Sequence, residues 1–465
     1  MSESYAELRL NYICYGCIKE HYLKNEVFTK GEDKLCYYCN SKRKAFLISD
    51  IACRINVVFN DYFRQTNESK SGLECDGIPI IKAIANTAGL TDAAAQDMQT
   101  ILAADHLRFW TPAMGGEAPY SSNSYYREQG PNDQMWQDKW KEFELNLKEE
   151  SRFFSSFAAE YLADVFKEIG TMSDADENPL IVDAGPGTKF PVFYRARAFQ
   201  SDESLKIGLR DPEKELGPPP ARLSIAGRMN AQGISVFYGA SEPRTAIAEV
   251  RPPVGSQVVV ARFKIAVPLR LLNLAALGCI KEEGSVFDPE FGNRLDHAMF
   301  LRSLKDHMTK PVMPSDQVLD YLPTQAIADF LANLKKPVID GILFPSVQDA
   351  GDVQNVVLFY KAALVETLEQ SEQMEAYERS GQSWEEFCFR RTGEEMRGQL
   401  LETSPPDDDA ADWLLDVGPW SPSDLRAPTL RLDRDSIEVY RVRGVDIHTD
   451  DNVSTRFRDI VADHV

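Results

Sequence analysis

The chain has 465 residues, more than one ordinary core accommodates, so we expect two or three domains. Its hydrophobic content of 43% and charged content of 26% are typical of a globular protein in water, and no apolar run is long enough to span a bilayer. A formal net charge of -21 argues against general nucleic-acid binding, which needs a basic surface. The first residues do not read as a signal peptide, so we expect a cytoplasmic protein without membrane contact.

Four of the eight cysteines form two CxxC pairs near the N-terminus: Cys14 with Cys17, and Cys36 with Cys39. Eighteen residues separate the pairs, a spacing that lets four thiolates surround one tetrahedral Zn²⁺. His21 could replace one cysteine, although four cysteines suffice. A closed shell leaves no position for a substrate, so we predict a structural Zn²⁺ that folds residues 1–44 as a zinc-ribbon segment.

Residues 45–178 are predicted to form an α-helical accessory domain. Apolar residues recur at three and four spacing over 46–63 and 91–110, and a longer amphipathic run covers 136–169. The candidate core residues of this last run are Trp140, Phe143, Leu147, Phe154, Phe157 and Leu162.

Residues 179–465 are predicted to be an α+β domain, because β-like segments dominate and helices are interspersed. The expected strands are 190–197, 258–265, 338–344, 355–364 and 436–448. A helix is expected over 318–334, and an acidic insertion at about 366–430, whose first part, 366–398, reads as helical. The GPGTK stretch at 185–189 lacks the order of a phosphate-binding loop and is interpreted as a turn.

The centre of this half is the segment 222–251. Gly227 and Asn230 favour a turn, since both residue types tolerate left-handed backbone angles. A short strand follows, and one face of it holds Ile234, Val236 and Tyr238. Ser241 is the expected N-cap of a helix that ends at Arg251.

Glu249 is an unusual feature of that helix. It shares a face with Ala246 and Val250, so a carboxylate lies on an apolar stripe and needs a partner or a function. One interpretation is an ion pair with a nearby arginine; the other is a catalytic carboxylate. A second pattern, Arg302 with His307, fits the RxxxxH spacing of HEPN ribonucleases, but it lies outside the helical domain and such spacing arises easily by chance.

Six segments occur in an order that resembles the RES domain, a family named for its Arg, Glu and Ser and known mainly as a bacterial toxin module that destroys NAD⁺. In this chain they are 193–197 (FYRAR), 227–230 (GRMN), 237–240 (FYGA), 245–249 (TAIAE), 340–346 (DGILFPS) and 355–359 (NVVLF). The N-terminal half resembles the zinc-ribbon and HEPN-like helical extension of longer RES proteins.

The resemblance implies a mixed β-sheet similar to that of ADP-ribosyltransferases, and cleavage of the nicotinamide–ribose bond of NAD⁺ by a toxin or defence effector. It implies Arg195, Glu249 and Ser346 as catalytic residues: the arginine holds the pyrophosphate, the carboxylate stabilises the cationic ribose or orients the acceptor, and the serine bonds the dinucleotide. Arg228, Tyr238 and Asn355 are the implied substrate-binding residues, although Asn355 could instead only brace the loop around Ser346.

The acceptor stays open between water and phosphate, as in a glycohydrolase or a phosphorylase. Two alternatives are a protein ADP-ribosyltransferase, and a non-catalytic module that binds zinc and NAD⁺. The family also suggests an antitoxin or another regulatory protein as partner, and leaves self-association into a homo-oligomer open.

Overall fold

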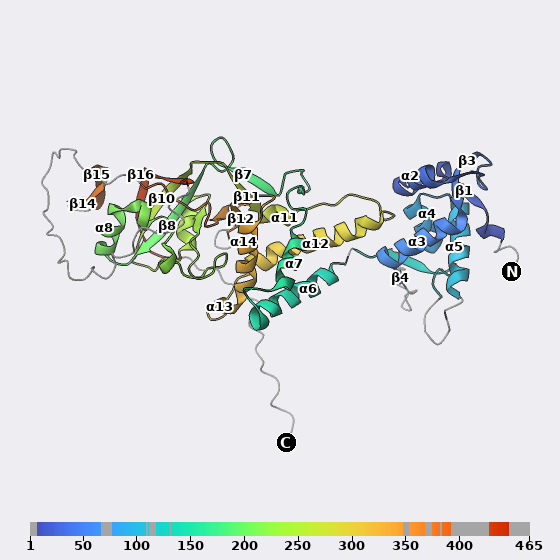
Figure 1. Cartoon of the computed structure of the whole chain (residues 1–465), viewed down its shortest axis with the longest axis horizontal. Coiled ribbons are helices and arrows are strands. Elements are labelled where there is room, and N and C mark those ends of the chain that lie inside the picture. Colours follow the sequence, from blue (N-terminus) through green and yellow to red (C-terminus); the bar gives the residue numbers. More distant parts are fainter. Residues whose placement is uncertain are drawn as a thin grey trace, which may run out of the picture. The chain divides into compact units, whose positions relative to one another are not determined.

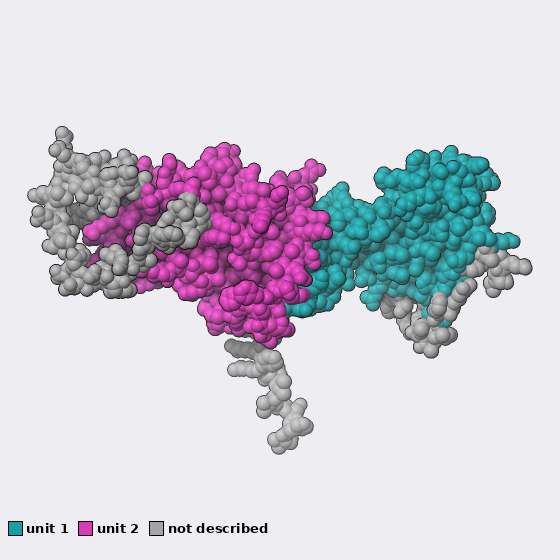
Figure 2. All heavy atoms as spheres, in the orientation of Figure 1, with its two compact units in different colours: residues 1–142, 280–303 teal, residues 143–279, 304–465 magenta. Residues whose placement is uncertain are grey.

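The computed structural model describes residues 7–66, 77–107, 110, 118–130, 132–346, 353–367, 374–381, 384–391 and 427–445. The chain divides into two compact units (Figure 1, Figure 2). Unit 1 comprises Met1–Glu142 and Ile280–Ser303, and unit 2 comprises Phe143–Cys279 and Leu304–Val465. The finer division at residues 44 and 178 stays a prediction. Across the described ranges, no helix is both long and apolar enough to cross a membrane.

Unit 1 combines helices with two small sheets. Its helical elements are η1 (Tyr15–Cys17), α2 (His21–Lys30), α3 (Ile48–Tyr62), α4 (Ile80–Ala88) and α5 (Asp92–Leu107), together with parts of α6 (Gln134–Leu145) and α12 (Pro289–Thr309). One sheet has the order β1-β3-β2 and consists of Tyr12–Cys14, Lys42–Leu47 and Glu32–Leu35. The other has the order β4-β6-β5 and consists of Phe63–Thr66, Tyr125–Glu128 and Ile78–Pro79.

One hydrophobic core joins the cysteine-rich segment of unit 1 to the helices α3, α4 and α5. Ile13 and Leu23 from the cysteine-rich segment are fully buried in the same cluster as Ile48 and Ile84 from the helices that follow. The helix α3 contributes because its apolar residues recur every three or four positions, as the sequence predicts. The cysteine-rich segment therefore has apolar support from the adjacent helices.

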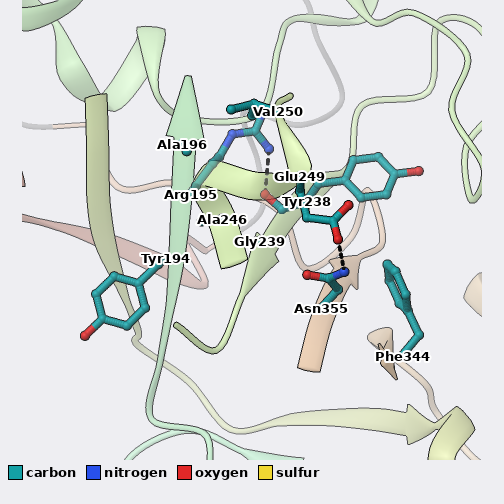
Figure 3. A pocket seen from close by; sticks show the side chains of 10 residues that line it. All are labelled: Tyr194, Arg195, Ala196, Tyr238, Gly239, Ala246, Glu249, Val250, Phe344 and Asn355. Carbon is teal, nitrogen blue, oxygen red and sulfur yellow. Dashed lines mark hydrogen bonds between the residues drawn. The ribbon is translucent and has the colours of Figure 1, made fainter. Parts of the chain in front are cut away.

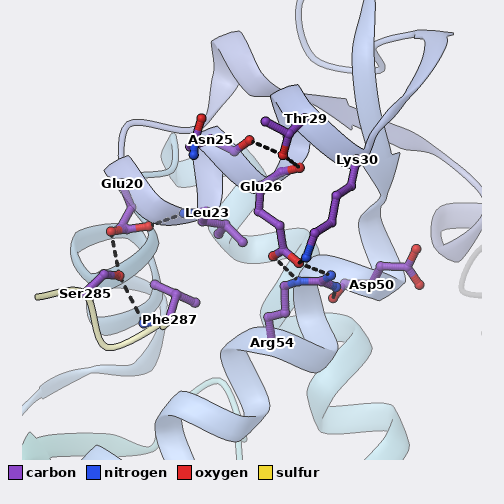
Figure 4. Close-up of polar contacts among 10 residues, drawn as sticks. All are labelled: Glu20, Leu23, Asn25, Glu26, Thr29, Lys30, Asp50, Arg54, Ser285 and Phe287. Carbon is purple, nitrogen blue, oxygen red and sulfur yellow. Dashed lines mark hydrogen bonds and ion pairs between the residues drawn. The ribbon is translucent and has the colours of Figure 1, made fainter. Parts of the chain in front are cut away.

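Two carboxylates fix α2 in unit 1 (Figure 4). Glu20 caps the helix by accepting bonds from the backbone N–H groups of Tyr22, at 3.1 Å, and Leu23, at 2.6 Å. Glu26 receives two bonds from the guanidinium of Arg54 on α3, at 2.8 and 3.0 Å. These contacts tie α2 both to its own first turn and to the neighbouring helix.

Unit 2 is built on an eight-stranded mixed sheet of order β16-β10-β8-β9-β13-β12-β11-β7. In chain order the strands are β7 (Ile181–Ala184), β8 (Val192–Phe199), β9 (Phe237–Ala240), β10 (Gln257–Ile265), β11 (Leu269–Asn273), β12 (Gly341–Pro345), β13 (Gln354–Leu358) and β16 (Leu430–Arg441). Only the pair β11–β12 is parallel. The architecture is α+β, as predicted, and each strand expected in this half is present with shifted ends.

The remaining described elements of unit 2 are mostly short helices. They are η3 (Asn146–Glu150), α7 (Ser156–Val165), α8 (Asp202–Arg210), α9 (Pro212–Glu215), η4 (Ala221–Leu223), α10 (Pro243–Glu249), α11 (Leu274–Leu277), α13 (Gln317–Asp320) and α14 (Leu322–Asn333). The helix expected over 318–334 is thus α13 and α14, with α14 opened by Pro323 in its first turn.

Alternation along β10 separates the two faces of the large sheet. Val259 and Phe263 belong to the main core, where the ring of Phe263 meets that of Phe237 edge-on at 5.0 Å. Val258 and Val260 point to the other face, into a small cluster that also contains Ala246 of α10. This second cluster seats α10 on the sheet.

Two sequence expectations outside the site are wrong. Phe154 is 97% exposed and is no core residue, because the chain leaves helical structure before α7 begins at Ser156. The predicted helix over 366–398 is contradicted by an antiparallel pair of strands, β14 (Met374–Gly381) and β15 (Trp384–Arg391). The rest of the acidic insertion, 392–426, lies outside the described residues. The turn predicted at 185–189 is confirmed, with Gly185 and Gly187 at φ values of 141° and 80°.

Candidate active site

The helix α10 is shorter than the sequence suggests. It ends at Glu249 rather than Arg251, and the residue at its N-cap is Glu242, which makes no side-chain capping bond. The hydroxyl of Ser241 instead accepts a bond from the backbone N–H of Gln354, at 3.1 Å, and so ties β13 to the start of the helix. Glu249 is exposed, not buried on an apolar stripe, because it occupies the free end of the helix.

The carboxylate of Glu249 is held by two donors from distant parts of the chain. Ser346, directly after β12, donates from its hydroxyl to Oε1 at 2.8 Å. Asn355 of β13 donates from Nδ2 to the same oxygen at 2.7 Å (Figure 3). The antiparallel pairing of β12 and β13 brings these donors to the same edge of the sheet. Glu249 therefore has a fixed orientation with Oε1 fully engaged.

Arg195 lies near this carboxylate, on β8. The strands β8 and β9 pair only at Tyr194 and Ala240, so the carbonyl of Tyr238 is free to accept a bond from Nη1 of Arg195, at 3.1 Å (Figure 3). Burial, reinforced by the neighbouring Arg197, lowers the pKa of Arg195 to about 10. The side chain stays charged at neutral pH, and it forms no ion pair with any described carboxylate.

A half-buried cation of this kind is costly unless an anion neutralises it. The Arg195 guanidinium is stacked over the ring of Phe237, at 5.4 Å, and its other N–H groups are available to a ligand. Guanidinium groups suit phosphate oxygens, to which they donate two parallel bonds. Arg195 is therefore a candidate anion-binding residue.

Tyr238 connects the strand β9 with the turn that precedes it. Its hydroxyl donates to Oδ1 of Asn230, at 2.9 Å, and accepts a bond from the backbone N–H of Met229, at 3.0 Å. Burial raises the pKa of Tyr238 to about 12, so the hydroxyl remains a donor. A Cβ at Gly227 would lie 2.6 Å from Asn230 Oδ1 and 2.9 Å from the Tyr238 hydroxyl. Close approach, not a left-handed backbone angle, is the reason for glycine there.

Arg228 is the one implied site residue that the structure directs elsewhere. Its Nη1 donates to the carbonyls of Met308 and Lys310, at 3.2 and 2.7 Å, and its guanidinium is stacked over the ring of Tyr321, at 5.1 Å. It does not line the cavity next to Glu249. A role for Arg228 in holding NAD⁺ stays a prediction.

A cavity of about 210 Å³ unites the other residues. It is lined by Tyr194, Arg195, Ala196, Tyr238, Gly239, Ala246, Glu249, Val250, Phe344 and Asn355 (Figure 3). Four of the six implied catalytic and substrate-binding residues thus line one cavity. Ser346 does not line it but bonds to Glu249, which does. A cation and a carboxylate face a space whose other walls are largely apolar or aromatic.

Several supporting residues were not predicted from the sequence. Thr324 and Gln325, at the start of α14, donate to the carbonyls of Arg228, at 2.5 Å, and Gly227, at 2.8 Å, and so brace the turn. The only sequence feature that could have indicated this role is that Thr324 and Gln325 are polar in an otherwise largely apolar helix. Phe344 of β12 also lines the cavity and is half-buried. The apolar sequence of this strand suggests only core packing.

The four predicted metal ligands come together in unit 1. The sulfur atoms of Cys14, Cys17, Cys36 and Cys39 all lie within 4.8 Å of one another. Arg302, of the RxxxxH pattern, donates from Nε to the carbonyl of Ile280, at 2.7 Å, which is a structural contact. His21 is not part of the cysteine cluster.

Fold and site together define an α+β domain with a cavity that opposes a cation to an oriented carboxylate. The family model of the RES domain matches residues 192–378, so this part of the chain carries a RES domain. The match confirms the resemblance drawn from the six sequence segments. No curated protein and no solved structure matches the chain. The HEPN-like character of residues 45–178 stays a prediction.

Proposed function

We propose that this protein degrades NAD⁺ by cleaving the bond between nicotinamide and ribose. The observation that carries the proposal is the cavity of the RES domain, where the oriented carboxylate of Glu249 and the unpaired guanidinium of Arg195 share one small space. NAD⁺ has the matching charges, since its pyrophosphate is anionic and its nicotinamide riboside becomes more cationic at the ribose as the bond breaks.

In the proposed reaction the bond between C1′ and the nicotinamide nitrogen breaks, and its electron pair leaves with neutral nicotinamide. The cation left on the ribose is stabilised by the free oxygen, Oε2, of Glu249, while Ser346 and Asn355 hold Oε1. An oxygen of water or phosphate then bonds to C1′ and loses its proton to solvent or to the carboxylate. Arg195 would bind the pyrophosphate, and Tyr238 would border the nicotinamide.

A test begins with purified full-length protein and NAD⁺, with and without phosphate, and separation of the products by chromatography. Free ADP-ribose would identify a glycohydrolase, and ADP-ribose-1″-phosphate would identify a phosphorylase. ADP-ribose attached to protein would instead support the transferase alternative. Binding of NAD⁺ without nicotinamide release, under all of these conditions, would contradict an enzyme and favour a binding module.

We also propose that the four cysteines hold one structural Zn²⁺. A tetrahedral site with Zn–S bonds of about 2.3 Å requires sulfur atoms about 3.8 Å apart. The separations are 3.9 Å between Cys14 and Cys17, 3.6 Å between Cys14 and Cys39, and 3.7 Å between Cys17 and Cys36. The backbone N–H of Cys14 points to the sulfur of Cys36, at 3.4 Å, the kind of outer contact that supports a bound thiolate. Elemental analysis of the purified protein would test for one equivalent of zinc.

A further inference from the structure

The small sheet β1-β3-β2 of unit 1 has one face on the core and one open face. Ile13 of β1 is fully buried, and Phe46, its partner in the register, packs against the same core. Lys34 of β2 and Arg43 of β3 are also direct partners. They lie on the opposite face, because side chains alternate between the two faces along a strand. Arg43 is exposed, and the Lys34 side chain is 43% exposed.

Each of these two cations lies over an aromatic ring. Nζ of Lys34 is 5.3 Å from the ring centroid of Tyr12, and the guanidinium carbon of Arg43 is 5.9 Å from that of Tyr15. Both rings are half-buried. The open face of the sheet therefore combines positive charge with aromatic surface.

Two further rings extend this surface, and both are more than half exposed. Phe28 of α2 is edge-on to Tyr15, with the ring centroids 5.1 Å apart. Tyr37 lies next to Tyr12, to whose carbonyl its backbone N–H donates at 2.8 Å. Contiguous apolar surface of this kind marks interaction sites. We call the set the ribbon face: Tyr12, Tyr15, Phe28, Lys34, Tyr37 and Arg43.

The charge of the cysteine-rich segment differs from that of the whole chain. Residues 1–44 contain eight Lys and Arg against six Asp and Glu, whereas the full chain carries a net charge of -21. Two of the six acidic residues are engaged elsewhere, since Glu20 caps α2 and Glu26 pairs with the arginine of α3. The net charge of the chain argues against general nucleic-acid binding, but it does not describe this segment.

Lys34 and Arg43 remain available to an anion. Nζ of Lys34 lies 3.3 Å from a carboxylate oxygen of Glu32, but that side chain is 71% exposed, and such surface pairs contribute little. Arg43 forms no ion pair with any described carboxylate. Its guanidinium suits phosphate oxygens, to which it can donate two parallel bonds.

We propose that the ribbon face binds a single-stranded nucleic acid. The phosphates pair with Arg43 and Lys34, and the bases stack on Phe28 and Tyr37. Cations beside aromatic rings are the combination that a single strand requires, because every base has a flat face and every linkage carries a negative charge. In a duplex the bases stack on one another and do not reach the rings. An acidic peptide would match the cations but leave the rings without partners.

The test measures the fluorescence anisotropy of a labelled oligothymidylate of about twelve nucleotides, titrated with the purified full-length protein. An oligouridylate and a DNA duplex of the same length are measured in parallel. We expect at least one single strand to bind about tenfold or more tightly than the duplex. With two phosphate contacts, the logarithm of the association constant should fall against the logarithm of salt concentration with a slope of about -1.4.

Variants separate the contribution of charge from that of the rings. Arg43→Gln, or Lys34→Gln if the first does not fold, should reduce the steepness of the salt dependence by about 0.7, because one phosphate contact is lost. Phe28→Leu and Tyr37→Leu keep apolar bulk but remove a ring. Each should weaken single-strand binding by about fivefold or more and leave the salt dependence unchanged.

Lys82→Gln is the matched control for charge. Lys82 is exposed on α4, outside the ribbon face, and forms no ion pair with any described carboxylate. This variant should bind the single strands as the wild-type protein does. Thermal melting of each variant reports whether it is folded.

Three results would overturn the inference. The first is that neither single strand binds at about 50 mM salt, where phosphate contacts are strong. The second is equal binding of duplex and single strands that is unchanged in folded Phe28→Leu and Tyr37→Leu, which would leave charge attraction alone. The third is binding of a polyglutamate peptide in place of the oligonucleotides, which would assign the face to an acidic protein. None of these results bears on the proposed cleavage of NAD⁺.

Discussion

At the scale of single residues, the candidate site contains two charged side chains, Glu249 and Arg195, which differ in exposure and in their partners. Glu249 is exposed, yet two donors fix one of its oxygens. Arg195 is buried enough for its pKa to fall to about 10, yet no described carboxylate neutralises it. The two donors hold the Glu249 carboxylate in one orientation, and the Arg195 guanidinium is left to pair with an anionic group of a ligand.

Glu249→Gln is expected to reduce the release of nicotinamide from NAD⁺ by at least about a hundredfold, because a neutral amide no longer stabilises the cationic ribose. The measurement is the rate of nicotinamide release at saturating NAD⁺. Glu242→Gln, at the other end of α10, is the control, since Glu242 makes no capping bond and lies away from the cavity. Wild-type rates in Glu249→Gln would exclude this carboxylate from the chemistry.

Arg195→Met is expected to weaken the binding of ADP-ribose by about ten- to a hundredfold, through loss of charge-assisted bonds to the pyrophosphate. A lowered pKa of about 10 still leaves the guanidinium protonated at pH 6 to 9, so the affinity of the wild-type protein should be flat over that range. Calorimetric titration at several pH values measures both quantities. An affinity that changes tenfold between pH 6 and 9 would show that a group other than Arg195 controls binding.

At the scale of elements, short segments far apart in the chain hold the site in position. Ser346 and Asn355 reach Glu249 because β12 and β13 pair, and Thr324 and Gln325 of α14 brace the turn beneath Tyr238. A larger cavity, of about 520 Å³, adjoins that turn at Met229. The contacts of α14 with the turn thus connect this helix to Tyr238, whose hydroxyl bonds to Met229 and Asn230 of the same turn.

In unit 1, the bonds between Glu26 of α2 and Arg54 of α3 are expected to make the stability of the fold depend on pH. Hydrogen bonding to Arg54 lowers the pKa of Glu26 below its unfolded value, so the interaction stabilises the fold above about pH 4.3 and is lost as the pH falls through the folded pKa. Glu26→Gln should lower the free energy of unfolding by about 1 kcal/mol at pH 7.

Urea denaturation of wild type and variant at pH 7 and at successively lower pH measures this difference. It should narrow as the pH falls toward the folded pKa of Glu26. Glu32→Gln is the control: it removes a carboxylate that is 71% exposed and is expected to leave the free energy of unfolding almost unchanged at every pH measured. A difference that stays constant from pH 7 to pH 3.5 would show that the Glu26 charge is not its source.

At the scale of the whole molecule, the cysteine cluster and the cavity next to Glu249 belong to different units with separate cores. Zinc removal by a strong chelator should therefore perturb the cysteine-rich segment more than the release of nicotinamide. Bound structural zinc contributes on the order of 10 kcal/mol to the folding of such segments. Circular dichroism and the NAD⁺ assay, followed in parallel, measure the two effects. Immediate loss of activity with unchanged folding would contradict a structural ion.

The sequence by itself determined the features that local pattern encodes. The spacing of Cys14, Cys17, Cys36 and Cys39 predicted their cluster, and β-branched runs predicted strands such as β10. The order of six short segments predicted the RES domain. Local pattern failed at 366–398, where charged residues suggested a helix and two strands formed, because strand pairing depends on a partner and not on the segment alone.

Only the tertiary structure decided how the side chains of the site meet. The pairing of β12 with β13 brings Ser346 and Asn355 to Glu249, and the divergence of β8 from β9 lets Arg195 bond to Tyr238. The same packing turns Arg228 toward the carbonyls of Met308 and Lys310 at the end of α12, and leaves Asn355 Oδ1 without a donor among the described residues. These contacts join residues that are 43 to 106 positions apart, so their physical cause is strand register and burial, which no local pattern contains.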